Sequence, residues 1–341
     1  MWRLSVRVIV AMFVEFLVTL AFFTLLFWVF GRFFDLKLLG MLAYGVFFTV
    51  ILIFIEWLLG PSMVSSTFNA RWIERSDDPV LWSMVHEEAK RAGVKVRKIG
   101  ILDNEAPNAL AYAFITGRPH LVFSKELMMN MTYPEMRAVA CYLIGSAKSG
   151  GLNLMTMFSG LLTVPYQMVG GFVGARLEGR RPGPGSYVAA GLSYLLFIVT
   201  YPQSVMISRI MSIYSDEFSI EQTGDPSRFL SALMKVSAGC ASRPVNLFRT
   251  KGTPLKCLMF QDPTTALRDA PAMKESATKW GINLEGVVDL KGLKLPEVGE
   301  VSLHAFEKFW SHQDLVDRME HAVEFGKKIQ SPIKIGLNWI E

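Results

Sequence analysis

The stretch Thr132–Gly151, TYPEMRAVACYLIGSAKSGG, is the part of the sequence from which the rest of the fold can be worked out. It predicts a helix with a well-defined beginning. Thr132 is a suitable capping residue, and Pro134 falls in the first turn, where a missing N–H costs little. Glu135 follows the cap by three residues, so its carboxylate can accept a hydrogen bond from the cap N–H.

The composition is that of an integral membrane protein. Of 341 residues, 51% are hydrophobic, and the mean hydropathy of +0.31 is high for a soluble chain. The net charge of +5 is ordinary for a membrane protein with basic flanks, and no basic–aromatic motif predicts a nucleic-acid partner. Cys141, Cys240 and Cys257 are widely spaced, which predicts reduced thiols facing a cytoplasm-like compartment.

Four apolar segments are predicted to cross a bilayer: residues 8–30, 38–60, 152–175 and 186–207. Basic residues flank the first pair, so the positive-inside rule predicts a multi-pass protein of the cell (inner) membrane with both termini in the cytoplasm. Glu15 is the one acid deep in a span, and we interpret it as hydrogen-bonded to a neighbouring helix. The loop between the second pair carries three arginines, against the rule. Whether that pair crosses fully is left open.

The spans divide the chain into four parts. We predict an N-terminal transmembrane hairpin, a first cytoplasmic half-domain, a second membrane hairpin and a second cytoplasmic half-domain, at residues 1–60, 61–151, 152–207 and 208–341. In the first half-domain we expect a helix at 71–93, and two short strands at 94–102 and 120–124 that form a hairpin. The predicted fold class is therefore a mainly α membrane protein with four transmembrane helices and a cytoplasmic α+β domain containing a small antiparallel sheet.

Further along the helix of residues 132–151, three positions have the spacing of a zinc-peptidase helix. In such helices two His residues four positions apart bind zinc, and a Glu after the first His activates water. The corresponding residues here are Tyr142, Leu143 and Ser146. The chain therefore keeps the spacing of such a helix but lacks the two His residues and the Glu that zinc binding and water activation require.

Five short motifs in order resemble the HtpX-type membrane zinc metallopeptidases, a gluzincin family. The resemblance covers nearly the whole chain, because the motifs alternate with the predicted spans in the family's order. The motifs are PNALA at 107–111, HLVFSKEL at 120–127, TYPEMRAV at 132–139, the segment Ser208–Asp216 with TGDP at 223–226, and SHQDLVDRM at 311–319.

This resemblance implies which positions once carried the chemistry. The first zinc His falls on Tyr142, the general-base Glu on Leu143, the second His on Ser146 and the third ligand on Ser212. The chain is thus similar to a degenerate member of the family. The positions that keep the family's residue are Asn108, Arg209, Asp216, His312 and Arg318.

The absent side chains predict an absent metal. A catalytic zinc needs three protein ligands and an open position for water, and neutral hydroxyls are poor ligands beside imidazole and carboxylate. We therefore expect no catalytic residue and no cofactor, although zinc is implied for active relatives. A nucleophilic Cys141 or Ser146 would need a nearby base. The best candidate for such a base, His312, lies far away in sequence.

Three functions are compatible with these residues. The first is an inactive pseudo-peptidase that acts as a membrane-anchored binding or scaffold subunit in membrane protein quality control. It would bind a membrane-protein or peptide client at an edge strand formed by His120, Leu121, Val122, Phe123 and Ser124.

The second is an active membrane metalloendopeptidase with other ligands, drawn from His120, Cys141, Asp216, Glu217 and His312. The third is a purely structural subunit of a larger membrane complex. Its partners would be the lipid bilayer and a stomatin-like scaffold, which the resemblance implies, or further copies of the chain.

Overall fold

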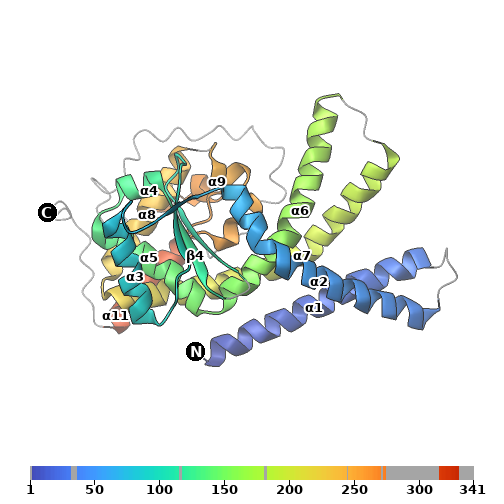
Figure 1. Cartoon of the computed structure of the whole chain (residues 1–341), viewed down its shortest axis with the longest axis horizontal. Helices are drawn as coiled ribbons and strands as arrows, with labels where there is room; N and C mark the ends of the chain where they lie inside the picture. The colour runs from blue at the N-terminus through green and yellow to red at the C-terminus, as the bar shows by residue number, and fades with distance from the viewer. Residues whose placement is uncertain are drawn as a thin grey trace.

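The computed structural model describes residues 2–31, 37–114, 117–179, 183–243, 245–269, 272–273 and 315–329. It consists of a globular domain and two long helical hairpins that project from the same side of it (Figure 1). The expectations for His312 and for the Glu15 side chain lie outside what is described.

A four-stranded sheet lies at the centre of the domain. Its strands are β1 (Arg71–Ile73), β2 (Lys98–Leu102), β3 (Ala109–Ala113) and β4 (Pro119–Ser124). The spatial order is β1-β2-β4-β3, with β2 and β4 parallel and the other two pairs antiparallel. The predicted antiparallel sheet is therefore wrong. Strand β4 lies beside β2 in parallel, and β3 pairs with the other side of β4.

This strand order also corrects the expected edge strand. The residues His120–Ser124 belong to β4, which is paired with β2 on one side and with β3 on the other. Its backbone N–H and C=O groups are thus used within the sheet, and an added peptide strand has no free edge there. The two outer strands are β1 and β3.

The helix predicted at 71–93 begins later in the structure. Arg71–Ile73 is strand β1, and α3 (Pro79–Ala92) follows a turn. Asp78 caps α3 by accepting a hydrogen bond from the Leu81 N–H at 2.9 Å, and Pro79 occupies the first turn. A favourable cap beside a proline thus sets the start of the helix, and the residues before it are free to pair with β2.

The other helices of the domain are α4 (Lys125–Asn130), α5 (Tyr133–Lys148), α8 (Pro226–Ser242), α9 (Leu247–Thr250), the 3₁₀ helix η2 (Thr253–Leu258) and α11 (Leu315–Lys328). The predicted start of α5 is confirmed: the Thr132 N–H donates to Glu135 Oε2 at 2.8 Å. Glu135 also accepts from Lys235 of α8 at 2.8 Å, which ties the beginning of α5 to its neighbour.

The two projecting hairpins are α1 (Trp2–Gly31) with α2 (Leu38–Phe68), and α6 (Gly151–Leu177) with the first part of α7 (Pro184–Thr223). Four spans were predicted, but only α2 and α7 are long and apolar enough to cross a membrane among the residues described. The described apolar stretch of α1, Phe16–Val29, is shorter. In α6, glycines and polar residues interrupt the apolar run.

The helix α7 continues without a break from its apolar part into the globular domain. It runs for 40 residues and contains Pro202. The apolar segment predicted at 186–207 is therefore only part of this helix. One continuous helix means that Ser212, the position of the expected third ligand, is joined rigidly to the apolar segment.

Candidate functional site

The positions that correspond to a zinc centre lie together where α5 packs against α7. Tyr142, Leu143 and Ser146 are on α5 and Ser212 is on α7, and all four side chains are buried. A hydrogen bond of 2.7 Å from Ser219 Oγ of α7 to the backbone oxygen of Ala138 of α5 links the two helices. The four positions are therefore buried on two helices that pack against each other.

The side chains at these four positions are poor metal ligands. The hydroxyl of Ser146 donates to the Leu143 carbonyl at 2.8 Å, and that of Ser212 to the Arg209 carbonyl at 3.0 Å. Both serines thus bond to their own helix. The Tyr142 hydroxyl has no partner among the described residues, and burial raises its pKa above the ordinary value. Every oxygen of the group is accordingly neutral.

A buried ion pair lies directly beside this group. Arg318 of α11 donates to Asp216 of α7 through two nitrogens, at 2.9 and 2.6 Å, and neither residue is exposed. Burial opposes the charge on Arg318, but Asp216 outweighs this effect and the pKa of the guanidinium is raised. The guanidinium carbon lies 5.4 Å from the centre of the Tyr142 ring. A fixed protein cation therefore already lies next to the position where a metal would bind.

The remaining space is filled by the segment that follows α9. Residues 254–266 are all buried, which is unusual for a segment with little regular secondary structure. Phe260 packs edge-to-face on Tyr142, with ring centres 4.9 Å apart. Its backbone N–H donates to the Ala109 carbonyl at 2.7 Å, and Met259 forms a bridge with Leu110. The same segment thus fills the centre and covers part of the outer edge of β3.

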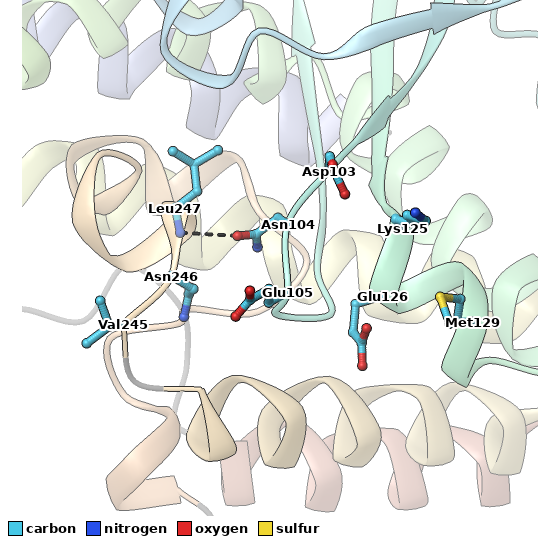
Figure 2. A pocket seen from close by; sticks show the side chains of 9 residues that line it. All are labelled: Asp103, Asn104, Glu105, Lys125, Glu126, Met129, Val245, Asn246 and Leu247. Atoms are coloured by element: carbon cyan, nitrogen blue, oxygen red, sulfur yellow. Dashed lines mark hydrogen bonds between the residues drawn. The ribbon is translucent and has the colours of Figure 1, made fainter.

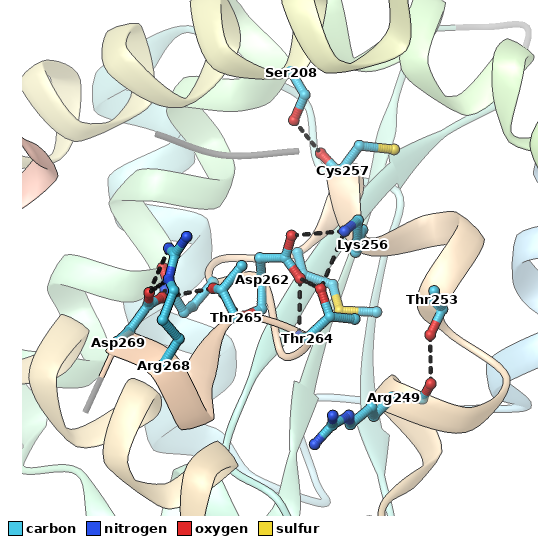
Figure 3. A network of polar contacts seen from close by, with 12 residues as sticks. Ser208, Arg249, Thr253, Lys256, Cys257, Asp262, Thr264, Thr265, Arg268 and Asp269 are labelled. Atoms are coloured by element: carbon cyan, nitrogen blue, oxygen red, sulfur yellow. Dashed lines mark hydrogen bonds and ion pairs between the residues drawn. The ribbon is translucent and has the colours of Figure 1, made fainter. Parts of the chain in front are cut away.

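Side chains satisfy the polar groups of this buried segment (Figure 3). Lys256 Nζ pairs with Asp262 Oδ2 at 3.0 Å, and both side chains are almost fully buried. Burial lowers the pKa of Lys256, but Asp262 outweighs it and the pKa is raised, so the amine stays charged. Thr265 donates to Asp269 at 2.6 Å. These contacts supply the hydrogen bonds that a buried loop needs.

The positions that keep the family's residue support this arrangement. Asn108 donates to the Gln261 carbonyl at 2.8 Å and accepts from the Gln261 N–H, so it holds the buried segment beside β3. Arg318 donates to the Phe260 carbonyl and to the Gln261 side chain. Arg209 is exposed and contributes only its carbonyl to Ser212. The retained His312 lies outside the described residues.

The alternative metal ligands do not form a cluster of three among the described residues. Cys141 Sγ is 3.7 Å from Glu88, and burial together with that carboxylate raises the pKa of the thiol. Glu217 contacts His321 at 3.1 Å, whereas His120 is at the beginning of β4 among aromatic rings. Among the described residues, no three His, Cys, Asp or Glu side chains come close enough to hold a metal. The donor set present does not fit zinc.

Sequence reasoning missed the residues that fill the centre, above all Phe260, Gln261 and Lys256. They lie in a stretch with turn residues and no regular hydrophobic period, which is typical of a surface loop. It also missed Glu88 of α3, which accepts from Arg137 at 2.7 Å and from Gln222 at 3.0 Å. Burial would raise the pKa of Glu88, but these partners lower it, so it remains charged.

A separate cavity of about 520 Å³ opens at the far end of β4 (Figure 2). The loop after β2, helix α4 and the segment before α9 form its walls. Glu126 is already paired with Arg243 at 2.9 Å, and Asn104 accepts from the Leu247 N–H at 3.1 Å. Its lining residues are Asp103, Asn104, Glu105, Lys125, Glu126, Met129, Val245, Asn246 and Leu247. None of the degenerate zinc positions lines this cavity.

Comparison with known proteins identifies relatives of this chain. The chain is 27% identical over 198 residues to the Protease HtpX homolog of Methanothermobacter thermautotrophicus, which covers 58% of this chain and 72% of the relative. It is 22% identical over 228 residues to the Protease HtpX homolog of Aeropyrum pernix, covering 64% and 71%. No solved structure matches. The sequence model of Peptidase family M48 matches residues 75–325, and the chain therefore belongs to peptidase family M48.

Proposed function

We propose that this protein is a catalytically inactive HtpX-like pseudo-peptidase that acts as a membrane-anchored binding or scaffold subunit, with membrane protein quality control as its setting. The observation that carries the proposal is the filled centre. Tyr142, Leu143, Ser146 and Ser212 take the places of three ligands and a base, and they are packed in protein rather than arranged around an open position.

Two further features support loss of catalysis. The first is electrostatic: Arg318 lies over Tyr142 and binds both carboxylate oxygens of Asp216, so the nearby carboxylate is already occupied by a protein cation. The second is steric: Phe260 packs edge-to-face on Tyr142 and both side chains are fully buried, so protein fills the space beside this position. A catalytic zinc requires three ligands and an open coordination position, and both are missing here.

The membrane-anchored part of the proposal is supported by α2 and α7, which are long and apolar enough to span a bilayer. We propose a multi-pass arrangement with both termini in the cytoplasm, as basic residues on the flanks favour. In that arrangement α7 would carry the degenerate centre close to the membrane, because the same helix contains the apolar segment and Ser212.

The proposal is tested on the full-length protein purified in mild detergent. Its zinc content is measured by elemental analysis, and casein hydrolysis is followed after dialysis against zinc. We expect well below one zinc per chain and no hydrolysis above a blank. The matched comparator is the Methanothermobacter relative prepared in the same way. Stoichiometric zinc with metal-dependent hydrolysis by this chain would overturn the proposal.

A second experiment tests whether the four positions form one buried group. The variant Tyr142→His/Leu143→Glu/Ser146→His/Ser212→Glu restores the family's residues. Without zinc it places additional ionisable groups in a dry interior, so its Tm should fall markedly. The control, Tyr142→Phe, removes only an unpaired hydroxyl and should leave the Tm near that of the wild type. An unchanged Tm in the fourfold variant would contradict the buried arrangement.

A further inference from the structure

We infer that the end of the sheet where β2 and β4 begin is a docking face for anionic lipid head groups of the membrane that anchors the chain. We call this region the basic sheet end. Its exposed cations and the aromatic residues beside them are Lys95, Arg97, Lys98, Arg118, Trp72 and Phe114. The inference rests on the membrane anchoring proposed above and adds a lipid specificity to it.

The sheet topology gathers these residues from distant parts of the sequence. Strands β2 and β4 are parallel and in register, with Lys98 opposite His120. The backbone N–H of Arg97 donates to the Pro119 carbonyl at 2.8 Å, which places Arg118 beside the same end. Because parallel strands begin at the same edge of a sheet, the cations from both strands lie together.

The cations of the basic sheet end lack acidic partners in the described part of the chain. Arg97, Lys98 and Arg118 are exposed, and none of them forms an ion pair with a described carboxylate. The Arg97 guanidinium lies 5.0 Å from the centre of the Phe114 ring, and the Lys98 amine 5.5 Å from that of Trp72. Aromatic faces thus support the long side chains while their charges remain open to a ligand.

A buried histidine lies beneath these cations and is affected by their positive charge. His120 is 4% exposed, and its ring nitrogens have no partner among the described residues. It packs against Trp72, Tyr112 and Phe114. Burial, with the charges of Arg97 and Lys98, lowers its pKa to about 4. Among the described residues no carboxylate contributes to this shift, which is consistent with the excess of exposed cations at this end of the sheet.

The basic sheet end also adjoins the place where the long helices leave the domain (Figure 1). At the end of β3, the Ala113 N–H donates to Thr156 of α6 at 3.0 Å. One turn further along α6, Ser159 donates to the Gly60 carbonyl of α2 at 3.2 Å. The cations therefore lie next to the bases of α2 and α6, where a head-group layer would meet the domain.

The acidic residue nearest to this end is Glu74, which directly follows β1, where Ile73 lies opposite Ile99 of β2. Glu74 is exposed and forms no ion pair with a described cation, and its N–H donates to Asp77 in the turn before α3. One carboxylate therefore stands against the four cations of the basic sheet end. Basic clusters beside a membrane anchor bind anionic lipids, and half-buried aromatic residues favour the interface. Charge and position together thus favour a membrane surface over an acidic protein segment as the occupant.

The experiment uses the full chain reconstituted in lipid nanodiscs. Lys95→Cys is labelled with an environment-sensitive fluorophore, since the native cysteines are buried. Discs of phosphatidylcholine are compared with discs containing phosphatidylglycerol, each with the same fraction of head-group quencher. We expect quenching to rise severalfold with phosphatidylglycerol and to fall again in 1 M salt, because each cation near an anionic surface contributes about fivefold in binding.

The test variant Arg97→Gln/Lys98→Gln/Arg118→Gln should lose this response. The matched control, Lys125→Gln/Lys251→Gln/Lys327→Gln, removes the same charge from exposed positions elsewhere and should keep it. Equal quenching in both kinds of disc, or equal loss in test and control variants, would overturn the inference. Membrane anchoring is tested separately, by whether the wild-type protein stays in discs of either composition. Loss from both kinds of disc would contradict anchoring, whereas retention without the quenching response would contradict lipid docking alone.

Discussion

The degenerate centre consists of Tyr142, Leu143, Ser146 and Ser212. Positive charge is buried beside this centre and exposed at the basic sheet end. Beside the centre, Arg318 is fully buried and its charge is neutralised by Asp216. At the basic sheet end, Arg97 and Lys98 are exposed and have no described carboxylate as a partner. A buried charge must be compensated within the protein, whereas an exposed charge can be compensated by a ligand. The comparison teaches that the buried charge contributes to stability, whereas the exposed charges are available to a ligand.

The largest expected effect comes from breaking the buried pair. Arg318→Met leaves Asp216 as an uncompensated charge and removes the hydrogen bonds to Phe260 and Gln261. We expect a loss of about 3–5 kcal/mol in the free energy of unfolding, measured by denaturant titration in detergent.

Two variants serve as controls for this loss. Asp216→Asn/Arg318→Met removes both charges and should recover part of it, because no isolated charge remains. Arg97→Met, at the basic sheet end, should cost less than about 0.5 kcal/mol. Equal losses in Arg318→Met and Arg97→Met would contradict the contrast between the two regions.

Truncating the aromatic side chain that fills the centre should cost nearly as much. Phe260 is fully buried, so Phe260→Ala removes its contact with Tyr142 and leaves a cavity. We expect about 3–5 kcal/mol of destabilisation. Phe114→Ala at the basic sheet end is the comparison: Phe114 is only half buried and should cost clearly less. A small loss at Phe260 would mean that the centre is open.

The buried histidine predicts a smaller, pH-dependent effect. The pKa of His120 is lowered from its ordinary value near 6.5 to about 4 in the folded protein. The unfolded state therefore binds more protons between these values, and stability falls as the pH is lowered from above 6.5 towards 4. A shift of this size corresponds to about 3 kcal/mol.

The variant His120→Phe isolates this contribution. It keeps an aromatic ring in the pocket and removes the titrating group, so its unfolding free energy should depend less on pH than that of the wild type. The measurement is denaturant unfolding at pH 7.5 and at pH 4.5 for both proteins. The same pH dependence in both would show that His120 is not held neutral.

The smallest effects are expected at the serines of the degenerate centre. Ser146 and Ser212 each donate to a carbonyl of their own helix, and neither hydroxyl contacts a second element in the described hydrogen bonds. Ser146→Ala and Ser212→Ala should therefore change the unfolding free energy by less than about 1 kcal/mol. A loss of several kcal/mol in either variant would show that the hydroxyl has a ligand or partner that this arrangement lacks.

Local sequence signals predicted where helices and strands form better than they predicted which elements lie beside one another. The capping arrangement of Thr132 and Glu135 marked the start of α5, because it depends on residues three apart. The position of β4 inside the sheet depended on pairing with both β2 and β3, which no local pattern records. The long apolar runs predicted helices, but they could not show that α7 continues unbroken through Pro202 into the domain.

The sequence by itself determined that Tyr142, Leu143, Ser146 and Ser212 offer no imidazole and no carboxylate, whatever their surroundings. Only the tertiary structure decided what packs around these positions. The packing of Phe260, the pairing of Arg318 with Asp216 and the clustering of Arg97, Lys98 and Arg118 join residues that are far apart in the chain. Side-chain identity sets chemical capacity residue by residue, whereas burial and charge compensation arise only from contacts between distant segments.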